Sequence, residues 1–260
     1  MLVAVGPDGK RPGHFPGRLV FTKHDIENGV QGLPPWSPRS LEQFVATVRD
    51  LDFPCPFARQ AQAQDSLYYA FCDSASTPAG RAHLLVACRE YLIELSSLTD
   101  TAALMAVLVA IFRPQERKLP LDAYRREAWA LLQWLHLHDP VPWPADVPTD
   151  PAAPTWTFCL YGTPLFVNVN TPAYRRRHSR NLGDGLVLVV QPRDAFDHIA
   201  GDTSRGRRLR QAIRARINAY DDIAASPHLG TYGHALESAQ YAPDDANGPA
   251  PKCPFVHRGR

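Results

Sequence analysis

Proline is the sequence feature that most constrains the fold of this chain. The 260 residues include 25 prolines, nearly twice the roughly 13 expected at an average of about 5%. Because proline does not fit a helix interior or a central strand, helices and strands must be short and separated by irregular connections. We therefore expect that much of the chain forms shaped loops.

Composition and charge narrow the class of protein. The residues are 45% hydrophobic and 21% charged, which is typical of a globular chain with a sizeable core and excludes fibrous, collagenous and wholly disordered proteins. The formal net charge is only +2. Such a small charge does not favour nucleic acid or an anionic membrane as the principal partner.

Three features predict the compartment. The apolar start of the chain is broken by Gly6 and Pro7, too early for a signal-peptide core. The longest apolar run, 102–112, has eleven residues, whereas a membrane helix needs about twenty. Five cysteines without CxxC pairing do not resemble a disulfide framework or a structural zinc site. We expect a cytoplasmic protein with reduced thiols and no membrane span.

Hydrophobic periodicity predicts the order of helices and strands. Residues 1–36, rich in glycine and proline, are expected to form a loosely ordered arm, and the proline-rich run 139–154 a packed, wrapping loop rather than a hinge. The order of elements predicts one α+β domain over residues 37–260, with a mixed β-sheet covered by helices. The helices are expected at 37–51, 80–98, 121–138 and 204–220, and the strands at 66–72, 102–112, 156–161, 164–170 and 185–191.

The common catalytic signatures are absent from the sequence. It contains no GxSxG, no GxxxxGK[ST], no GxGxxG after a strand and no HExxH, so hydrolase, kinase and nicotinamide-dehydrogenase functions have no support from motifs. Cysteine, histidine and arginine residues in unusual contexts remain as candidates.

Cys55 is the first candidate, because prolines flank it on both sides in the run FPCPFA, 53–58. A stiff loop that presents one sulfur suits an axial thiolate ligand of haem iron. Cys55 is equally consistent with a small buried hydrophobic residue in a Pro-Phe cluster. Cys253 stands in a similar run, CPF, where docking of the terminal segment through Phe255 is favoured.

His136 is the second candidate. It continues the row of Trp129 and Leu132 on the shoulder of a helix's apolar face. An imidazole there is suited to be an axial ligand or a distal acid and base, or simply a hydrogen-bonded histidine near a helix C-terminus.

Arginine forms two clusters, one at 175–180 and one along the predicted last helix. Guanidinium groups suit bidentate recognition of carboxylates and phosphates. For the helical cluster, a solvated face is the favoured interpretation.

Several further segments of the chain are distinctive when they are taken together. They are FPCPFA, LLQWLHLHDPVPWPADVPTDP, the block 156–183 with its NTPAY and SRNLG elements, VVQPRDAF and SPHLGTYG. In this order, from residue 53 to Phe255, they resemble the YqcI/YcgG family of haem-dependent N-oxygenases, and the block 156–183 is the most specific.

The resemblance implies an enzyme that binds haem b, with its iron, and uses dioxygen and external electrons to hydroxylate the guanidino group of L-arginine or of a related guanidine or amine. Electrons would come from a separate reductase, because no flavin or nicotinamide motif is visible. A non-catalytic haem sensor or carrier is the alternative. The sequence predicts neither the exact substrate nor the oligomeric state.

Carried over by position, the resemblance makes Cys55 the axial thiolate, with His136 the runner-up and Cys253 a further possibility. The SPHLG run departs from the family pattern, since its histidine, His228, comes one position later than expected. The motifs also give the expected catalytic residues His136, Asn170, Arg180 and Asn181. Charge complementarity, rather than the resemblance, places Arg177, Arg180 and Arg193 beside the haem propionates or the substrate carboxylate, and Asp139 or Asp194 beside a guanidinium.

Overall fold

A five-stranded mixed sheet runs through the centre of the computed structural model, which describes residues 17–259. The strands follow the order β1-β2-β5-β4-β3; β1 and β2 pair in parallel and the other pairs are antiparallel. This arrangement confirms the predicted α+β fold with a mixed sheet. The strands are β1 (Leu67–Cys72), β2 (Val107–Phe112), β3 (Phe158–Leu160), β4 (Thr163–Asn170) and β5 (Val187–Pro192).

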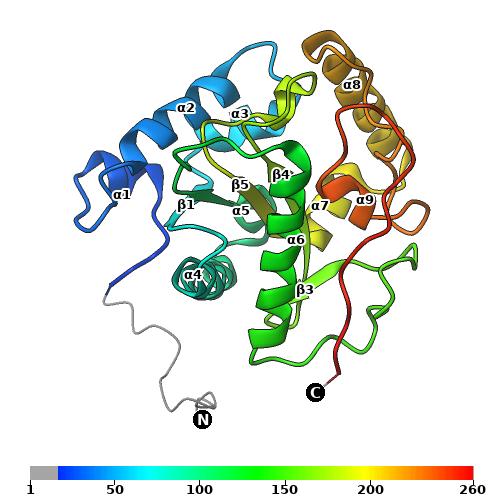
Figure 1. The fold of residues 1–260 in the computed structure, drawn as a ribbon. Coiled ribbons are helices and arrows are strands. Elements are labelled where there is room, and N and C mark those ends of the chain that lie inside the picture. The colour runs from blue at the N-terminus through cyan, green and yellow to red at the C-terminus, as the bar shows by residue number, and fades with distance from the viewer. Residues whose placement is uncertain (1–16, 260) are drawn as a thin grey trace.

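Helices pack on both sides of this sheet (Figure 1). The long helices expected from periodicity are all present, with boundaries within a few residues of the prediction. Within residues 17–259 the helices are α1 (Lys23–Glu27), α2 (Ser37–Arg49), α3 (Pro56–Ala63), α4 (Pro78–Ser97), α5 (Asp100–Met105), α6 (Leu121–His138), α7 (Arg193–Ala200), α8 (Ser204–Tyr220) and α9 (Ser238–Tyr241), with a short 3-10 turn, η1 (His178–Arg180).

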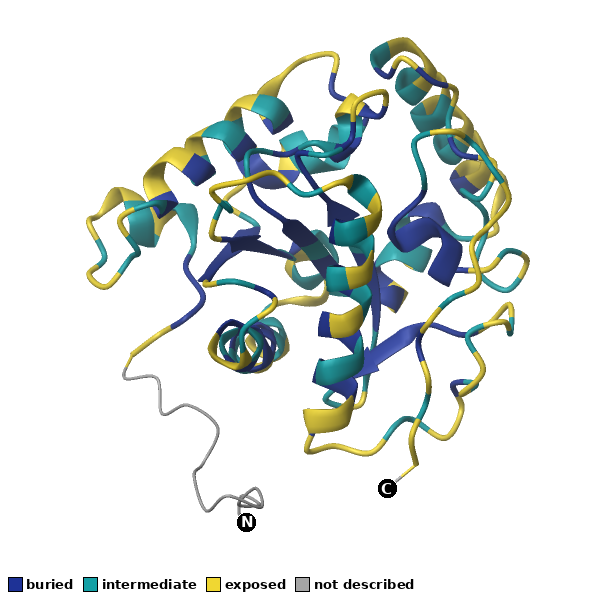
Figure 2. Ribbon diagram, viewed as in Figure 1, coloured by how far each residue is buried: buried dark blue, intermediate teal, exposed yellow. Residues whose placement is uncertain are grey.

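One face of the sheet forms the larger hydrophobic core with α4 and α6. Successive side chains of a strand point to opposite faces, so Tyr68 and Ala70 of β1 join this core while Tyr69 joins the other. Leu84 of α4 and Leu131 of α6 are almost completely buried against it. Figure 2 shows most strand residues buried, whereas the long helices carry exposed residues on their outer sides.

The opposite face is covered by α2 and α3, with α5, α7 and α8 beside them. Phe44 and Val48 of α2 pack here with Phe71 and Ile111 of the strands. This packing leaves room between the sheet, α7 and α8, where the candidate site lies.

The structure differs from the sequence prediction in the run 102–112, where we expected one strand. Residues up to Met105 belong to helix α5, Ala106 is extended, and β2 begins at Val107. The run is apolar throughout, so it carries no periodicity to separate a buried helical turn from a buried strand.

The predicted N-terminal arm is only partly covered by the structure. Residues 1–16 lie outside the described residues. Residues 19–21 are buried, and Phe21 pairs with Tyr69 of β1 through two backbone hydrogen bonds. This second part of the arm is therefore packed against the sheet.

The proline-rich run 139–154 packs against the body of the protein. Trp143 contacts Trp156 and Phe255, and Val147 is buried. No helix within residues 17–259 is both long and apolar enough to cross a membrane.

Candidate functional site

A cavity of about 300 Å³ lies on the side of the sheet that α2 and α3 cover. This volume is at the lower end of the range for small-molecule sites, about 300–1,000 Å³. The walls are mainly apolar, with a few amide and guanidinium side chains. From the strands, the lining residues are Leu67, Val107, Val109, Phe166, Asn168, Asn170, Val189 and Gln191.

Cys55 lines this cavity from the first turn of α3. It is the N-cap residue, and Pro56 occupies the first helical position, where its missing N–H costs no hydrogen bond. The sulfur makes no capping hydrogen bond, but the backbone N–H groups of Phe57 and Ala58 lower the pKa of the thiol. The segment around Cys55 is therefore not the stiff loop expected from the sequence but the start of a helix, and the cysteine lies at the positive end of that helix.

The surroundings of Cys55 favour the neutral thiol when no ligand is bound to the sulfur. Burial raises its pKa above the usual value, while the backbone N–H groups of Ala58 and Phe57 and the charge of Arg216 lower it. The sulfur thus sits among groups that would stabilise a thiolate once a cation binds it.

Arg216 of α8 holds the segment that leads to Cys55. Its guanidinium donates to the carbonyls of Leu51 and Phe53, at 2.6 and 2.8 Å. Tyr220, one helical turn further on, packs edge-to-face on Phe53 with ring centroids 5.9 Å apart. The position of Cys55 is therefore determined by α8 as well as by its own helix.

Arg180 is a buried cation that lines the same cavity. Its guanidinium donates to the side-chain oxygen of Asn168 at 2.7 Å and to the carbonyls of Tyr241 and Gln240 at 3.2 and 3.1 Å. No carboxylate of the described residues lies within ion-pair distance of it. Burial lowers the pKa of this guanidinium, and the charge of Asp221 raises it. A buried charge that forms no direct ion pair is costly, so the cavity favours an anionic group beside Arg180.

Asn170 and Arg177 also line the cavity but are held by the protein. The Asn170 amide donates to the carbonyls of Asn168 and Val187. The Arg177 guanidinium donates to the carbonyls of Asp244 and Ala224 and to the side chain of Asn247. Arg177 thus anchors the C-terminal loop to the wall of the cavity.

Helix α8 contributes residues that the sequence did not single out as part of a site. Arg210, Ile213, Arg214 and Ile217 line the cavity, and Asp221 directly follows the helix. Their spacing of three and four residues places them on one side of α8. The arginines of α8 are therefore divided: Arg205 and Arg208 are exposed, as a solvated face requires, while two others face the cavity.

The predicted residue His136 lies in a different place. It belongs to α6, on the opposite side of the sheet, and packs against the rings of Trp143 and Phe255. Its Nε2 atom is 3.2 Å from the backbone nitrogen of Arg258. His136 does not line the cavity, so the structure does not bring it together with Cys55.

Cys253, Asn181 and the two aspartates proposed for guanidinium binding also lie outside the lining. Cys253 packs against the larger core, and the Asn181 side chain accepts from Gly183. Asp139 accepts from the backbone of Val141 and Tyr161. Asp194 is exposed and accepts from the amide of its own neighbour in α7.

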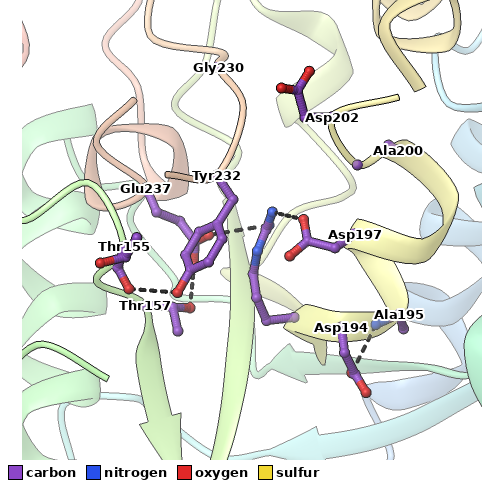
Figure 3. A network of polar contacts seen from close by, with 12 residues as sticks. Thr155, Thr157, Asp194, Ala195, Asp197, Ala200, Asp202, Gly230, Tyr232 and Glu237 are labelled. Carbon is purple, nitrogen blue, oxygen red and sulfur yellow. Dashed lines mark hydrogen bonds and ion pairs between the residues drawn. The ribbon is translucent and has the colours of Figure 1, made fainter. Parts of the chain in front are cut away.

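Arg193 lies behind the cavity wall rather than in it. Its guanidinium pairs with Asp197 and, at 3.2 Å, with the buried Glu237. Both of these carboxylates are labelled in Figure 3. It also lies over the rings of Phe196 and Tyr232, at 4.9 and 4.5 Å. Since Phe196 lines the cavity, Arg193 supports that wall.

Glu237 is a buried carboxyl with several partners. Thr157 and Tyr241 both donate to its Oε1 atom, whereas Oε2 contacts only Arg193, without hydrogen-bond geometry. Burial raises the pKa of Glu237 to about 7, although Arg193 and the two hydroxyl donors lower it.

Comparison with known proteins gives a family match and three relatives. The model of the YqcI/YcgG family matches residues 44–256. A Streptomyces lavendulae protein named "Putative N(omega)-hydroxy-L-arginine synthase DcsA" is 38% identical over 244 residues, covering 92% of this chain and 90% of that protein.

Two Bacillus subtilis (strain 168) proteins, the uncharacterized proteins YqcI and YcgG, are each 32% identical to this chain. The matches cover 91% and 92% of this chain and 94% and 95% of those proteins. No solved structure matches the chain significantly.

Proposed function

The chain belongs to the YqcI/YcgG family, and from this premise we propose that it is a haem-dependent enzyme that hydroxylates a nitrogen of the guanidino group of L-arginine or a related guanidine. The printed name of the Streptomyces relative supports the substrate and the product. The structural observation that carries the proposal is that Cys55, at a helix N-terminus, faces the same cavity as the buried cation Arg180.

The lining residues of the cavity have the chemistry to bind haem b. Iron in a haem needs one axial ligand from the protein, and a cysteine thiolate is an established type. Cys55 offers a sulfur at the N-terminus of a helix, where backbone N–H groups favour the thiolate. The apolar walls suit a porphyrin, and Arg180 suits a carboxylate, which both a haem propionate and an amino-acid substrate carry. Bound haem would supply the activation of dioxygen.

The proposed reaction balances with an external source of electrons. One atom of dioxygen forms the new N–O bond and the N–OH group, and the other atom leaves as water. The sum consumes two electrons and two protons in addition to dioxygen and the guanidine. A separate reductase would deliver the electrons.

The protein's own residues would hold the reactants and exclude water. Arg216 keeps the segment before Cys55 in place. Arg180 would hold a carboxylate by charge and hydrogen bonds. Val109, Val189 and Phe196 provide an apolar wall, which strengthens these polar interactions by lowering the local dielectric constant.

The absorption spectrum of the reduced protein with carbon monoxide tests the ligand. We expect the wild-type protein to bind haem and to give the red-shifted Soret band of a thiolate-ligated complex. Cys55→Ala should lose this band. Cys253→Ala is the matched control, because its cysteine stands in a similar CPF run outside the cavity, and it should keep the band.

Turnover separates the enzyme from the alternative haem sensor or carrier. The wild-type protein, given arginine, dioxygen and a reductase, should form N-hydroxyarginine. Haem binding without product would support the sensor, and a wild-type protein that binds no haem would contradict both functions. A spectrum unchanged in Cys55→Ala would refute Cys55 as the ligand.

A further inference from the structure

Asp221 is the only carboxylate among the described residues that line the cavity. It follows the last residue of α8, and 8% of its surface is exposed. The cavity otherwise carries guanidinium, amide and hydroxyl groups. Asp221 therefore gives one part of an otherwise cationic cavity a negative charge.

The carboxylate of Asp221 is held in one orientation by Ser179. The backbone N–H of Ser179 donates to one oxygen and its hydroxyl donates to the other, both at 2.8 Å. Each carboxylate oxygen has a second acceptor site. Asp221 can thus accept two further hydrogen bonds without losing the two that position it.

No cation of the described residues forms an ion pair with Asp221. The guanidinium of Arg177 is bonded to the carbonyls of Asp244 and Ala224 and to Asn247. The ring of His178 pairs with Asp222, at 2.8 Å. Burial raises the pKa of Asp221, while the Ser179 hydrogen bonds and the more distant charges of Arg177 and His178 lower it. A buried carboxylate of this kind is stabilised by a cation that enters the cavity.

We propose that Asp221 binds the guanidinium group of the substrate through a hydrogen-bonded ion pair. The inference rests on the proposed function and identifies the residue that selects a cationic guanidine over a neutral analogue. Ser179 holds the two carboxylate oxygens from one side, and a guanidinium N–H can donate to the acceptor site that stays open on an oxygen. The cavity also holds a buried cation, Arg180, which bonds to Asn168 and to two backbone carbonyls and feels the charge of Asp221. An amino acid with a cationic side chain carries both complementary charges.

Binding of arginine and citrulline tests this role. Citrulline has the shape of arginine but a neutral ureido group. We expect the wild-type holoprotein to bind arginine at least about tenfold more tightly than citrulline, by calorimetry or by the change in the haem spectrum. Asp221→Asn should weaken arginine binding by about 10- to 100-fold and leave citrulline binding unchanged.

Asp222→Asn is the matched control for this variant. Asp222 is the next residue, is exposed and lies outside the cavity lining, so its loss should leave both affinities unchanged. Asp221→Asn preserves the size of the side chain and an acceptor for Ser179. If it nevertheless fails to fold, Asp221→Glu replaces it, and this variant should bind arginine more weakly yet still prefer it to citrulline.

The outcomes distinguish the inference from the proposed function. Arginine binding that Asp221→Asn leaves unchanged, in a wild-type protein that binds arginine, overturns the role of Asp221 alone. A glutamate variant that binds citrulline as tightly as arginine also overturns it. A wild-type holoprotein that binds neither ligand contradicts the proposed substrate class.

Discussion

Replacing Glu237 by glutamine should remove a pH dependence from the stability of this fold. Glu237 is almost completely buried, and its pKa is raised from 4.5 to about 7 in the folded protein, mainly by burial. At a pH between these two pKa values, the Glu237 carboxyl is protonated in the folded protein and ionised in the unfolded chain. The folded state is therefore favoured most below pH 4.5 and loses stability as pH rises to 7.

The size of this effect follows from the difference between the two pKa values. Each pKa unit corresponds to about 1.4 kcal/mol, so a difference of about 2.5 units gives a loss of about 3 kcal/mol between pH 4.5 and pH 7. Glutamine keeps an oxygen that accepts from Thr157 and Tyr241 and does not titrate. Arg193 keeps its partner Asp197 in the variant, so no isolated buried cation is created.

Urea denaturation of both proteins at several pH values between 4.5 and 8 measures this difference, with tryptophan fluorescence as the signal. The variant should gain stability relative to the wild type as pH rises, by about 3 kcal/mol across the range. Glu42→Gln removes an exposed carboxyl of α2 and is the matched control for the loss of a carboxyl group. A difference between wild type and Glu237→Gln that stays constant with pH would refute the reasoning.

Two further predictions concern residues on either side of the sheet. His136→Ala should lower the free energy of unfolding through lost aromatic packing but leave haem and arginine binding unchanged, because His136 lies outside the cavity; lost haem binding in a folded variant would contradict this. Arg216→Met should move the pH profile of Cys55 alkylation, followed by mass spectrometry in haem-free protein, to higher pH, because the nearby cation lowers the pKa of this thiol. The exposed Arg208→Met of the same helix is the control, and an equal shift in both variants would count against a specific effect.

Long periodic segments could be predicted from the sequence, and shorter ones could not. Helix α6 was predicted at its true boundaries because its apolar face repeats through five turns. Helix α3 was missed, because two prolines around Cys55 indicated a loop, although proline at the first helical position begins a helix readily. Helix α7 is only eight residues long and offers too few turns for periodicity to be evident.

The candidate site could be predicted only in part. Cys55, Asn170, Arg177 and Arg180 were identified from motifs and do line one cavity. The contribution of α8 was missed, since arginine on a helix usually indicates a solvated face. One side of α8 carries residues spaced three and four apart that could have indicated a buried face: Arg210, Ile213, Arg214 and Ile217. Which part of the protein covers that face depends on tertiary packing, and the local sequence does not determine it.

The alternation of side chains along β4 divides this strand into two sets of positions with separate effects on the protein. Asn168 and Asn170 line the cavity, whereas Val167 and Val169 belong to the larger core. Substitutions at the cavity positions should change which ligand binds, and substitutions at the core positions should change the free energy of unfolding. Phe166 belongs to both sets, so a mutant library restricted to Asn168 and Asn170 would change the cavity while leaving the core residues of β4 unchanged.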